Sequence, residues 1–307
     1  MSEQKTQSEV GSETGNHISP PPLLDPRRNA FRPDLADANL KERVNANKFV
    51  HGQPAIIARA SVPLRREPRG IAPIDTEALL GEQVTVFENS GGWAWVQLTR
   101  DSYVGYMPTD TLGEKEHVTT HHVRSIGTFV YPEPDIKTPP LMHLSLNSEL
   151  SVIDTINSFY KLATGGYVSA RHLAPRSKYA KDYVEVAERF IGTPYLWGGR
   201  TRIGIDCSGL VQVALQAAGI NAPRDSDMQL EELGTTVLVP DDLEGLMRGD
   251  LVFWDNHVGI MSDGIMLLHA NAHHMAVTFE TLPEAAQRIA NAGSKITAIK
   301  RLTDTVN

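Results

Sequence analysis

The sequence contains only one cysteine, Cys207, among its 307 residues, so a disulfide within the chain is excluded. It also has no apolar run long enough to span a bilayer, so no membrane partner is expected. Aromatic residues make up 7% of the chain and no basic stripe is interleaved with them. Because the formal net charge is −8 as well, nucleic acid is not an expected partner. These absences describe a soluble chain and leave its lone thiol to be explained.

The first residues are also poor in the features of a targeting segment. Residues 1–20 are rich in Ser, Glu, Gln, Thr and Gly, and they lack the basic and apolar regions of a signal peptide. An unpaired cysteine without disulfides fits a reducing compartment, so the sequence predicts a cytoplasmic protein. Residues 1–48 are predicted to form a disordered tail followed by an N-terminal arm, with weak helical signal over 27–47.

Cys207 lies at the predicted start of a helix, in the run Asp206-Cys207-Ser208-Gly209. Helical spacing relates five apolar residues that follow it, namely Leu210, Val211, Ala214, Leu215 and Ala218. Gly219 then provides a stop signal. The unpaired N–H groups and the dipole of a helix N-terminus favour a thiolate. This placement is typical of a cysteine nucleophile, which needs a base nearby.

Two histidines are expected to supply that base. Short apolar runs flank the turn Ser262-Asp263-Gly264 and predict a β-hairpin. A three-residue loop pairs Met261 with Ile265 and, four residues further along each strand, His257 with His269. Directly opposed residues have Cβ atoms roughly 4.5–5.5 Å apart, so the two imidazoles lie side by side. One ring can accept the thiol proton while the other fixes its tautomer and orientation.

Two other interpretations of these residues remain open from the sequence. A single buried cysteine is often an inert apolar residue, although polar neighbours argue against that here. Alternatively, Cys207, His257 and His269 could form a three-ligand zinc site. The chain lacks the closely paired ligands of most zinc motifs, so we expect no metal and no other cofactor.

Five blocks, taken in order, resemble the NlpC/P60 cysteine peptidases: Pro194–Gly199, Asp206–Leu210, Gly249–Trp254, His257–Ile260 and Leu268–Ala270. The resemblance covers about residues 180–302 and implies a papain-like fold. It also implies that Cys207 is the nucleophile, His257 the base and His269 the orienting third residue. Tyr195 matches a family tyrosine that helps to stabilise the oxyanion, with the backbone N–H of Cys207 as a second donor. Trp197 and Ser208, in the same blocks, are expected to contact substrate.

The residues before this region read as two copies of one small β module, offset by about sixty residues. The copies cover 49–115 and 118–175 and resemble bacterial SH3-like (SH3b) domains, with Trp95 and the run Gly105–Pro108 as anchors in the first. The expected fold is therefore α+β. A papain-like NlpC/P60 catalytic domain over 180–305 follows two small SH3-like β-barrels.

Tandem SH3b domains before an NlpC/P60 domain resemble the murein-peptide γ-D-glutamyl-L-diamino acid endopeptidases of the dipeptidyl-peptidase VI type. This resemblance implies a murein tri- or tetrapeptide substrate, L-Ala-γ-D-Glu-diaminopimelate, with a free amine. Glu67 and Tyr103 of the first barrel, with Asp225 and Ser226 of the peptidase domain, would hold that amine. A carboxylate and hydroxyl cluster suits an ammonium group, which has three donors and full charge.

Two alternative functions remain: an extracellular hydrolase acting on intact wall, and a catalytically silent wall-binding module. The sequence does not choose between diaminopimelate and lysine at the cleaved bond, and it does not set the oligomeric state or the role of residues 1–48. It also does not tell whether Arg200 and Arg202, just before the nucleophile, contact substrate.

Overall fold

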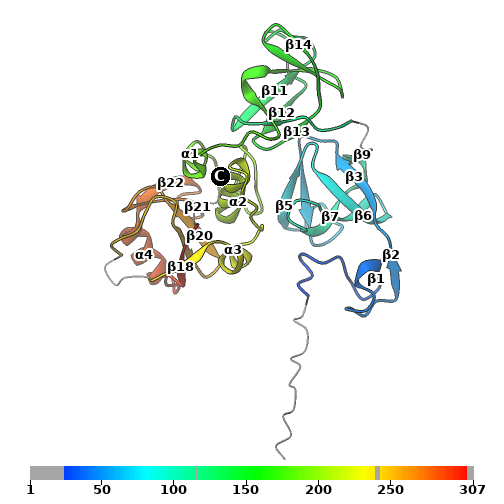
Figure 1. Ribbon diagram of the computed structural model, residues 1–307. Coiled ribbons are helices and arrows are strands. Elements are labelled where there is room, and N and C mark those ends of the chain that lie inside the picture. The colour runs from blue at the N-terminus through cyan, green and yellow to red at the C-terminus, as the bar shows by residue number, and fades with distance from the viewer. Residues whose placement is uncertain (1–23, 115–116, 239–242, 303–307) are drawn as a thin grey trace, which may run out of the picture.

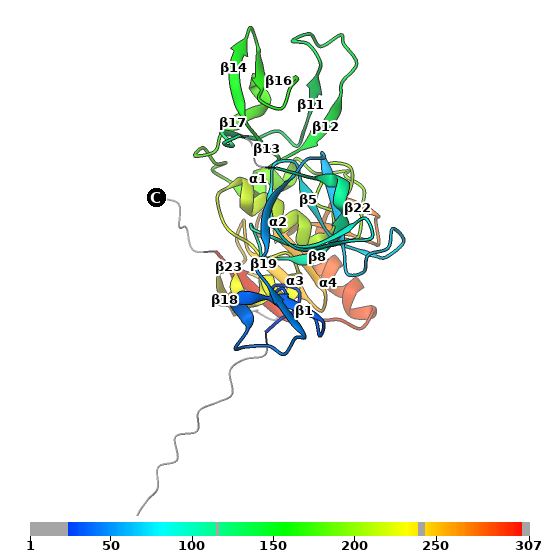
Figure 2. The same ribbon diagram turned by 90° about the vertical axis from the view of Figure 1, so that its right-hand side faces the viewer.

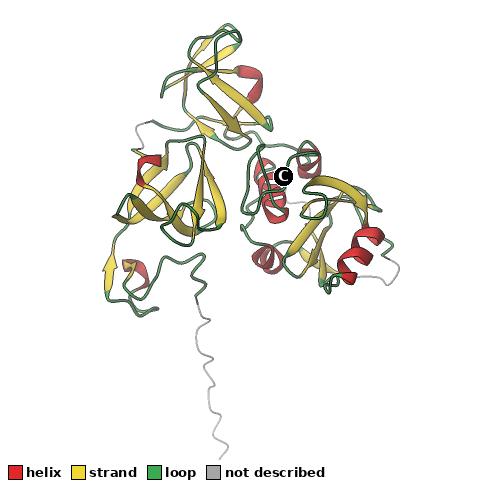
Figure 3. Cartoon of the chain, turned by 180° about the vertical axis from the view of Figure 1, so that it is seen from behind, coloured by secondary structure: helices red, strands yellow, loops and turns green. Residues whose placement is uncertain are grey.

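The computed structural model describes residues 24–114, 117–238 and 243–302. Three lobes meet around one junction: a first module (residues 53–113), a second module (residues 121–175) and a C-terminal domain (residues 183–301) (Figure 1). The two modules consist almost wholly of strands, whereas the α-helices lie in the C-terminal domain (Figure 3). No helix in these three described stretches is long and apolar enough to cross a bilayer.

An N-terminal arm (residues 24–50) lies against the first module. Its strand β1 (Leu35–Asp37) pairs in parallel with β2 (Lys48–Val50). The buried arm residues Ala30 and Leu35 pack against Phe87 and Trp95 of the first module. The helix suggested by the weak spacing is not formed in the described part of the arm: Asp37 caps a 3₁₀ turn, Ala38–Leu40, instead. The predicted disordered tail falls on residues 1–23, outside the described residues.

The first module is a seven-stranded sheet. In pairing order its strands are β5 (Ile74–Leu79), β4 (Ser61–Arg65), β8 (Val104–Pro108), β7 (Trp93–Leu98), β6 (Gln83–Ser90), β3 (Gln53–Ile57) and β9 (Leu112–Gly113). Alternation along β7 buries Ala94, Val96 and Leu98, which pack with Val84 and Met107 in one core. A 3₁₀ turn, Thr109–Thr111, leads into β9.

The second module repeats the strand pairing of the first. One sheet contains β12 (Met142–Ser145), β11 (Gly127–Tyr131), β16 (Tyr167–Ser169), β15 (Phe159–Leu162) and β14 (Val152–Ile156), and the other β13 (Glu149–Leu150), β10 (His121–Val123) and β17 (Leu173–Pro175). In the first module β3 pairs with β6 and β9, β4 with β5 and β8, and β7 with β6 and β8. In the second, β10 pairs in the same way with β13 and β17, β11 with β12 and β16, and β15 with β14 and β16. A 3₁₀ turn, Ala170–His172, again precedes the last strand. This order agrees with the internal repeat expected from the sequence.

The C-terminal domain contains α1 (Tyr183–Glu188), α2 (Cys207–Ala217), α3 (Ser226–Glu232) and α4 (Leu282–Asn291). Its six-stranded sheet runs in the order β18 (Thr235–Val237), β23 (Ala298–Arg301), β19 (Leu251–Trp254), β20 (His257–Met261), β21 (Met266–Asn271) and β22 (Ala276–Thr281). The apolar face of α2 packs on Val258 and Leu268, while Leu282 of α4 packs with Met261 and Leu267. The two helices therefore form separate cores with alternate residues of the same strands.

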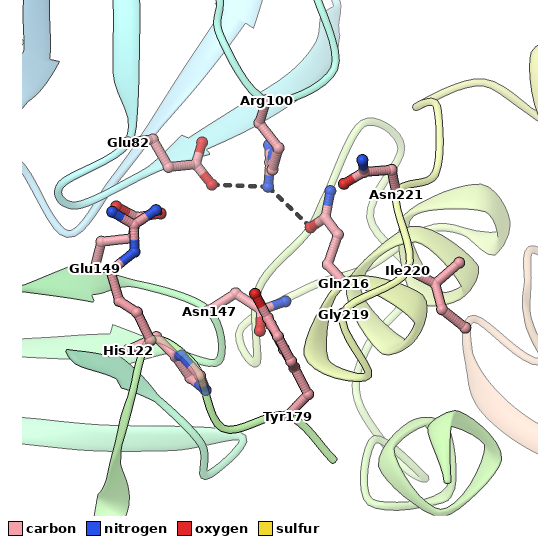
Figure 4. A pocket seen from close by; sticks show the side chains of 11 residues that line it. Glu82, Arg100, His122, Asn147, Glu149, Tyr179, Gln216, Gly219, Ile220 and Asn221 are labelled. Atoms are coloured by element: carbon pink, nitrogen blue, oxygen red, sulfur yellow. Dashed lines mark hydrogen bonds and ion pairs between the residues drawn. The ribbon is translucent and has the colours of Figure 1, made fainter. Parts of the chain in front are cut away.

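The lobes are joined by buried polar contacts. A cavity of about 160 Å³ lies at their meeting point. Figure 4 shows how Glu82 and Arg100 of the first module face Gln216 of α2 there. Arg100 Nη1 pairs with Glu82 Oε1 at 2.8 Å and donates to Gln216 Oε1 at 2.9 Å. In the view of Figure 2 the first module lies directly in front of the C-terminal domain. The first module is thus attached to the helix that begins with Cys207.

Candidate active site

The start of α2 is fixed by the side chain of Asp206. Its Oδ1 accepts from Gly209 N at 2.7 Å, which is the N-cap hydrogen bond of α2. Its Oδ2 accepts from Gly198 N at 2.8 Å and from Arg224 Nη2 at 2.7 Å. Cys207 is therefore the first helical residue, in the turn that the apolar spacing predicts, and it is 7% exposed.

Burial of Cys207 acts against the thiolate that the helix N-terminus favours. Burial raises the pKa of Cys207 to about 12, and the carboxylate of Asp206 adds to the rise. Backbone N–H groups of Val258 and Ser208 and the charge of Arg224 act in the opposite direction. Desolvation outweighs the helix terminus here. The contact with Val258 N also shows that the thiol lies beside the start of β20, next to His257.

The histidine hairpin has a different register from the predicted one. Met261 pairs with Leu267, not with Ile265, because the loop spans residues 262–265 and Ser262 N donates to Met266 O at 2.8 Å. A shift of two residues leaves every side chain on its predicted face. His257 and His269 are consequently diagonal neighbours, and their Nε2 and Nδ1 atoms are 2.8 Å apart.

A carboxylate that the sequence analysis missed completes this chain of side chains. Glu280 of β22 lies 2.6 Å, through Oε1, from His269 Nε2, and Arg288 of α4 donates to the same oxygen. Although burial opposes ionisation, these hydrogen bonds hold the pKa of Glu280 at about 2. The signal was present: once β22 is paired with β21, Glu280 falls on the same face as His269.

The direction of each hydrogen bond follows from these charges. An ionised Glu280 can only accept, so His269 Nε2 carries the proton. Burial lowers the pKa of His269, leaving its Nδ1 to accept from His257 Nε2. Burial and the neighbouring His269 lower the pKa of His257 to about 3, so its Nδ1 is unprotonated. His257 Nδ1 therefore has a free lone pair that can accept a proton.

Cys207 opens into a cavity of about 350 Å³ between the C-terminal domain and the first module. Seven of the residues singled out in the sequence line it: Tyr103, Tyr195, Trp197, Cys207, Ser208, Asp225 and Ser226. Tyr195 is half-buried, and burial raises the pKa of its hydroxyl, which remains an O–H donor. Trp197 is 60% exposed at the rim.

The first module contributes to this cavity through a buried contact. The Tyr103 hydroxyl donates to Asp225 Oδ2 at 3.1 Å, and Tyr103 is 5% exposed. Burial raises the pKa of Asp225. Tyr103 lies in the connection between β7 and β8, whereas Asp225 directly precedes α3. The tyrosine and the carboxylate therefore meet only because the two lobes are docked.

Glu67 lies elsewhere, so its assignment to the amine site is not supported by its position. It is exposed and pairs with Arg69 within its own loop. Arg66, the residue before Glu67, lines the cavity instead and is paired with Asp75 at 2.5 Å.

Three arginines lie near the nucleophile, and for two of them, Arg200 and Arg202, the sequence left contact with substrate open. Arg224, 1% exposed, joins the first module to α2 by donating to Thr76 Oγ1 at 2.9 Å and to Ser208 Oγ at 2.8 Å. The Ser208 hydroxyl is therefore engaged by this guanidinium. Arg200 is fully buried and Arg202 donates to Thr193, and neither belongs to the cavity lining.

The described stretches of the chain contain no group of three or more His, Cys, Asp or Glu side chains arranged to hold a metal ion. The nitrogens through which His257 and His269 face each other are engaged in their mutual hydrogen bond. The arrangement instead provides a thiol and a neutral phenol on the lining of one cavity. The unprotonated imidazole of His257 follows the lining residue Asn256 in sequence, and neither His257 nor His269 belongs to the lining itself.

Comparison with known proteins shows to which families parts of this chain are similar. The model of the NlpC/P60 family matches residues 192–292, and the model of the bacterial dipeptidyl-peptidase Sh3 domain matches residues 64–112. The chain carries an NlpC/P60 domain and a bacterial SH3 domain. The NlpC/P60 domain is a cysteine peptidase domain. The predicted papain-like α+β fold, with SH3-like structure before it, is confirmed.

Several curated proteins are similar to this chain over most of its length. The γ-D-glutamyl-L-lysine dipeptidyl-peptidases of Bacillus subtilis and Bacillus cereus are 29% and 28% identical, over 69% and 66% of this chain. Dipeptidyl-peptidase 6 of Lysinibacillus sphaericus is 28% identical over 75%. These matches span 77%, 64% and 92% of the relatives. A crystal structure of an NlpC/P60 family protein from Bacillus cereus superposes with a TM-score of 0.69 at 21% identity, covering 82% of this chain and 100% of that one.

Proposed function

We propose that the chain is a cysteine endopeptidase that hydrolyses the γ-D-Glu–diamino acid bond of murein peptides with a free N-terminal L-Ala. The observation that carries this proposal is the buried Tyr103–Asp225 pair, which shares one cavity with Cys207. The names of three relatives, which are dipeptidyl-peptidases, support an endopeptidase acting on peptidoglycan peptides.

The cavity suits a substrate that ends in an ammonium group. Asp225 supplies a negative charge and Tyr103 a hydroxyl, and both are largely withdrawn from water. A charged hydrogen bond in such a place contributes roughly 1.5–3 kcal/mol. Acetylation of the amine would remove this contribution and leave the carboxylate buried against a neutral group. The peptides of intact wall have this nitrogen in an amide, so the proposed substrate is a released peptide and the proposed role is recycling.

The proposed reaction uses Cys207, His257 and His269 in that order. Cys207 Sγ attacks the γ-carbonyl of D-Glu while its proton passes to Nδ1 of His257. The oxyanion accepts from the Tyr195 hydroxyl and from the backbone N–H of Cys207. His269, held by Glu280, stabilises the imidazolium of His257 that forms for this step.

The second half of the reaction returns the protons. The imidazolium of His257 protonates the leaving amine of the diamino acid, and the C–N bond breaks to give a thioester. His257 then takes a proton from water, whose oxygen attacks the thioester carbonyl. Collapse of that adduct releases L-Ala-D-Glu and returns the proton to the thiol. No metal or organic cofactor enters these steps.

One experiment tests substrate and nucleophile together. L-Ala-γ-D-Glu-diaminopimelate is offered with its amine free or acetylated, and the products are identified by mass. We expect L-Ala-D-Glu from the free peptide only, and no hydrolysis by Cys207→Ala. Turnover by that variant, or equal cleavage of the acetylated peptide, would overturn the proposal. Cleavage at the corresponding lysine peptide would set the preference for the diamino acid.

The alternatives have their own outcomes in this test. An extracellular hydrolase would clear purified peptidoglycan, and a silent wall-binding module would cleave neither peptide but retain binding to wall. A cytoplasmic location is part of the recycling proposal. Recovery of the protein in a culture or envelope fraction would contradict that part.

A further inference from the structure

A residue of the N-terminal arm reaches the amine end of the cavity. Arg27 Nη1 donates to Asp225 Oδ2 at 2.9 Å, the oxygen that also accepts from Tyr103. The same guanidinium donates to Asp227 Oδ2 at 2.7 Å and to Asp25 Oδ2 at 2.7 Å. Arg27 is therefore surrounded by three carboxylates and lines the cavity into which Cys207 opens.

The backbone holds this arginine in place. Val104 N, in β8, donates to Arg27 O at 2.8 Å, and Gln97 Nε2, in β7, donates to Arg28 O at 2.9 Å. Asp25 accepts from the backbone N of Arg27 as well as from its side chain, which sets the side-chain direction. The arm is thus hydrogen-bonded to the same two strands whose connection carries Tyr103.

Arg27 differs from the other arginines of the cavity lining in the aspartates with which it pairs. The lining includes three arginines and four aspartates. Arg66 is paired with Asp75, and Arg224 with Asp206. The remaining lining aspartates, Asp225 and Asp227, are paired with Arg27. Without its charge, the amine end would present two aspartates to whatever enters.

We propose that Arg27 occupies the cation subsite of the cavity, so that a substrate ammonium must displace it from Asp225 in order to bind. This inference rests on the proposed function, because it assigns the amine to Asp225. A displaced Arg27 keeps its bonds to Asp25 and Asp227, so the exchange affects only part of its network. Arg27 is accordingly a specificity-determining residue: a ligand whose amine is blocked has no charge with which to replace the guanidinium.

The competition acts on binding and not on the chemical step. The guanidinium lies at Asp225, whereas the reacting atoms lie at Cys207 and His257. We therefore expect Arg27→Gln to lower KM for the free-amine peptide by about two- to five-fold, the range of a partly exposed ion pair, and to leave kcat unchanged. Arg27→Lys keeps the charge without the planar fork and should give an intermediate KM.

Arg28→Gln provides the matched control. Arg28 belongs to the same arm, but it pairs with Glu232 of α3 and does not belong to the cavity lining. A rise in KM for Arg27→Gln would mean that Arg27 helps to bind substrate, and an unchanged KM would mean that it does not compete. An equal fall for Arg28→Gln would assign the effect to loosening of the arm. Each of these results overturns the proposal.

The two proposals fail differently. If the wild-type protein does not prefer the free to the acetylated peptide, the amine site itself is wrong and both proposals fall. If that preference holds but Arg27→Gln leaves KM unchanged, only the competition is wrong. Thermal unfolding of each variant shows whether it folds. If Arg27→Gln does not fold, the KM of Arg27→Lys decides the question.

Discussion

At the scale of single residues, burial decides the state of the catalytic pair. It raises the pKa of Cys207 to about 12 and lowers that of His257 to about 3. An acid with a raised pKa stays protonated through neutral pH, and a base with a lowered pKa stays unprotonated. These two shifts favour the uncharged form of both side chains.

The neutral thiol predicts slow alkylation. Iodoacetamide should modify Cys207 slowly at pH 7, and the rate should rise with pH toward the thiol pKa of about 12. Because this is the only cysteine, the mass of the intact protein reports the reaction directly. The denatured chain, with a thiol pKa near 8.5, is the control and should react faster at pH 7. A rate that is already maximal near neutral pH would indicate a thiolate–imidazolium pair.

Glu280 acts on the reaction through His269, so its removal should affect kcat and leave KM unchanged. Glu280→Gln keeps the size of the side chain but loses the charge that stabilises the imidazolium. We expect kcat to fall by about tenfold or more, as for other partners of a catalytic histidine. Glu284→Gln, an exposed carboxylate in the first turn of α4, is the control. A change confined to KM would place Glu280 in substrate binding.

At the scale of elements, residues close together in sequence predicted the start of a helix, whereas the pairing of strands was harder to predict. The start of α2 was predictable because the cap Asp206 and the apolar spacing lie within a few residues of Cys207. The register of the histidine hairpin was not, since Asp263 accepts from two backbone N–H groups and lengthens the loop. The weak helical signal of the arm was misleading, because Leu35 packs on Trp95 from a strand and not from a helix. The place of Arg27 in the cavity was not predicted, because the lining aspartates with which it pairs, Asp225 and Asp227, lie 198 and 200 residues away in sequence.

The loop before α2 makes a testable close approach to the first module. Gly198 has φ +77°, and a Cβ there would lie 2.4 Å from the carbonyl oxygen of Ile74 in β5. Gly198→Ala should therefore lower both the thermal unfolding midpoint and kcat/KM. Gly92→Ala is the control for backbone strain alone, because Gly92 has φ +81° with open space around it. Equal losses in the two variants would show that contact with Ile74 is unimportant.

At the scale of the whole molecule, the first module is part of the active site. Arg200 is fully buried, donates to Glu77 O at 2.7 Å and to Gln216 Oε1 at 3.0 Å, and so links β5 to α2. The NlpC/P60 matches and the tandem modules were predictable from motifs, but this docking depends on buried groups that no motif records. The cavity exists only where the two lobes meet.

Removal of the Arg200 side-chain charge should separate these lobes. Arg200→Met removes the hydrogen bonds to Glu77 O and Gln216 Oε1 and one of the two cations near Glu82, which keeps its pair with Arg100. The loss is about 1.5–3 kcal/mol. We expect a lower thermal unfolding midpoint and a lower kcat/KM, because Tyr103 and Asp225 lose their alignment. Arg202→Met, two residues away and bonded to Thr193, is the control and should change both little. Equal effects would assign the loss to the loop alone.

The two modules share their strand pairing but differ in the connection between their central strands. In the first, this connection carries Tyr103; in the second, the corresponding segment between β15 and β16 is only Ala163-Thr164-Gly165-Gly166. The second module thus has no tyrosine in the segment that corresponds to the one carrying Tyr103. Transfer of the Tyr103 connection into the second module would not create a second amine site. The position of this connection relative to Cys207 matters more than its sequence.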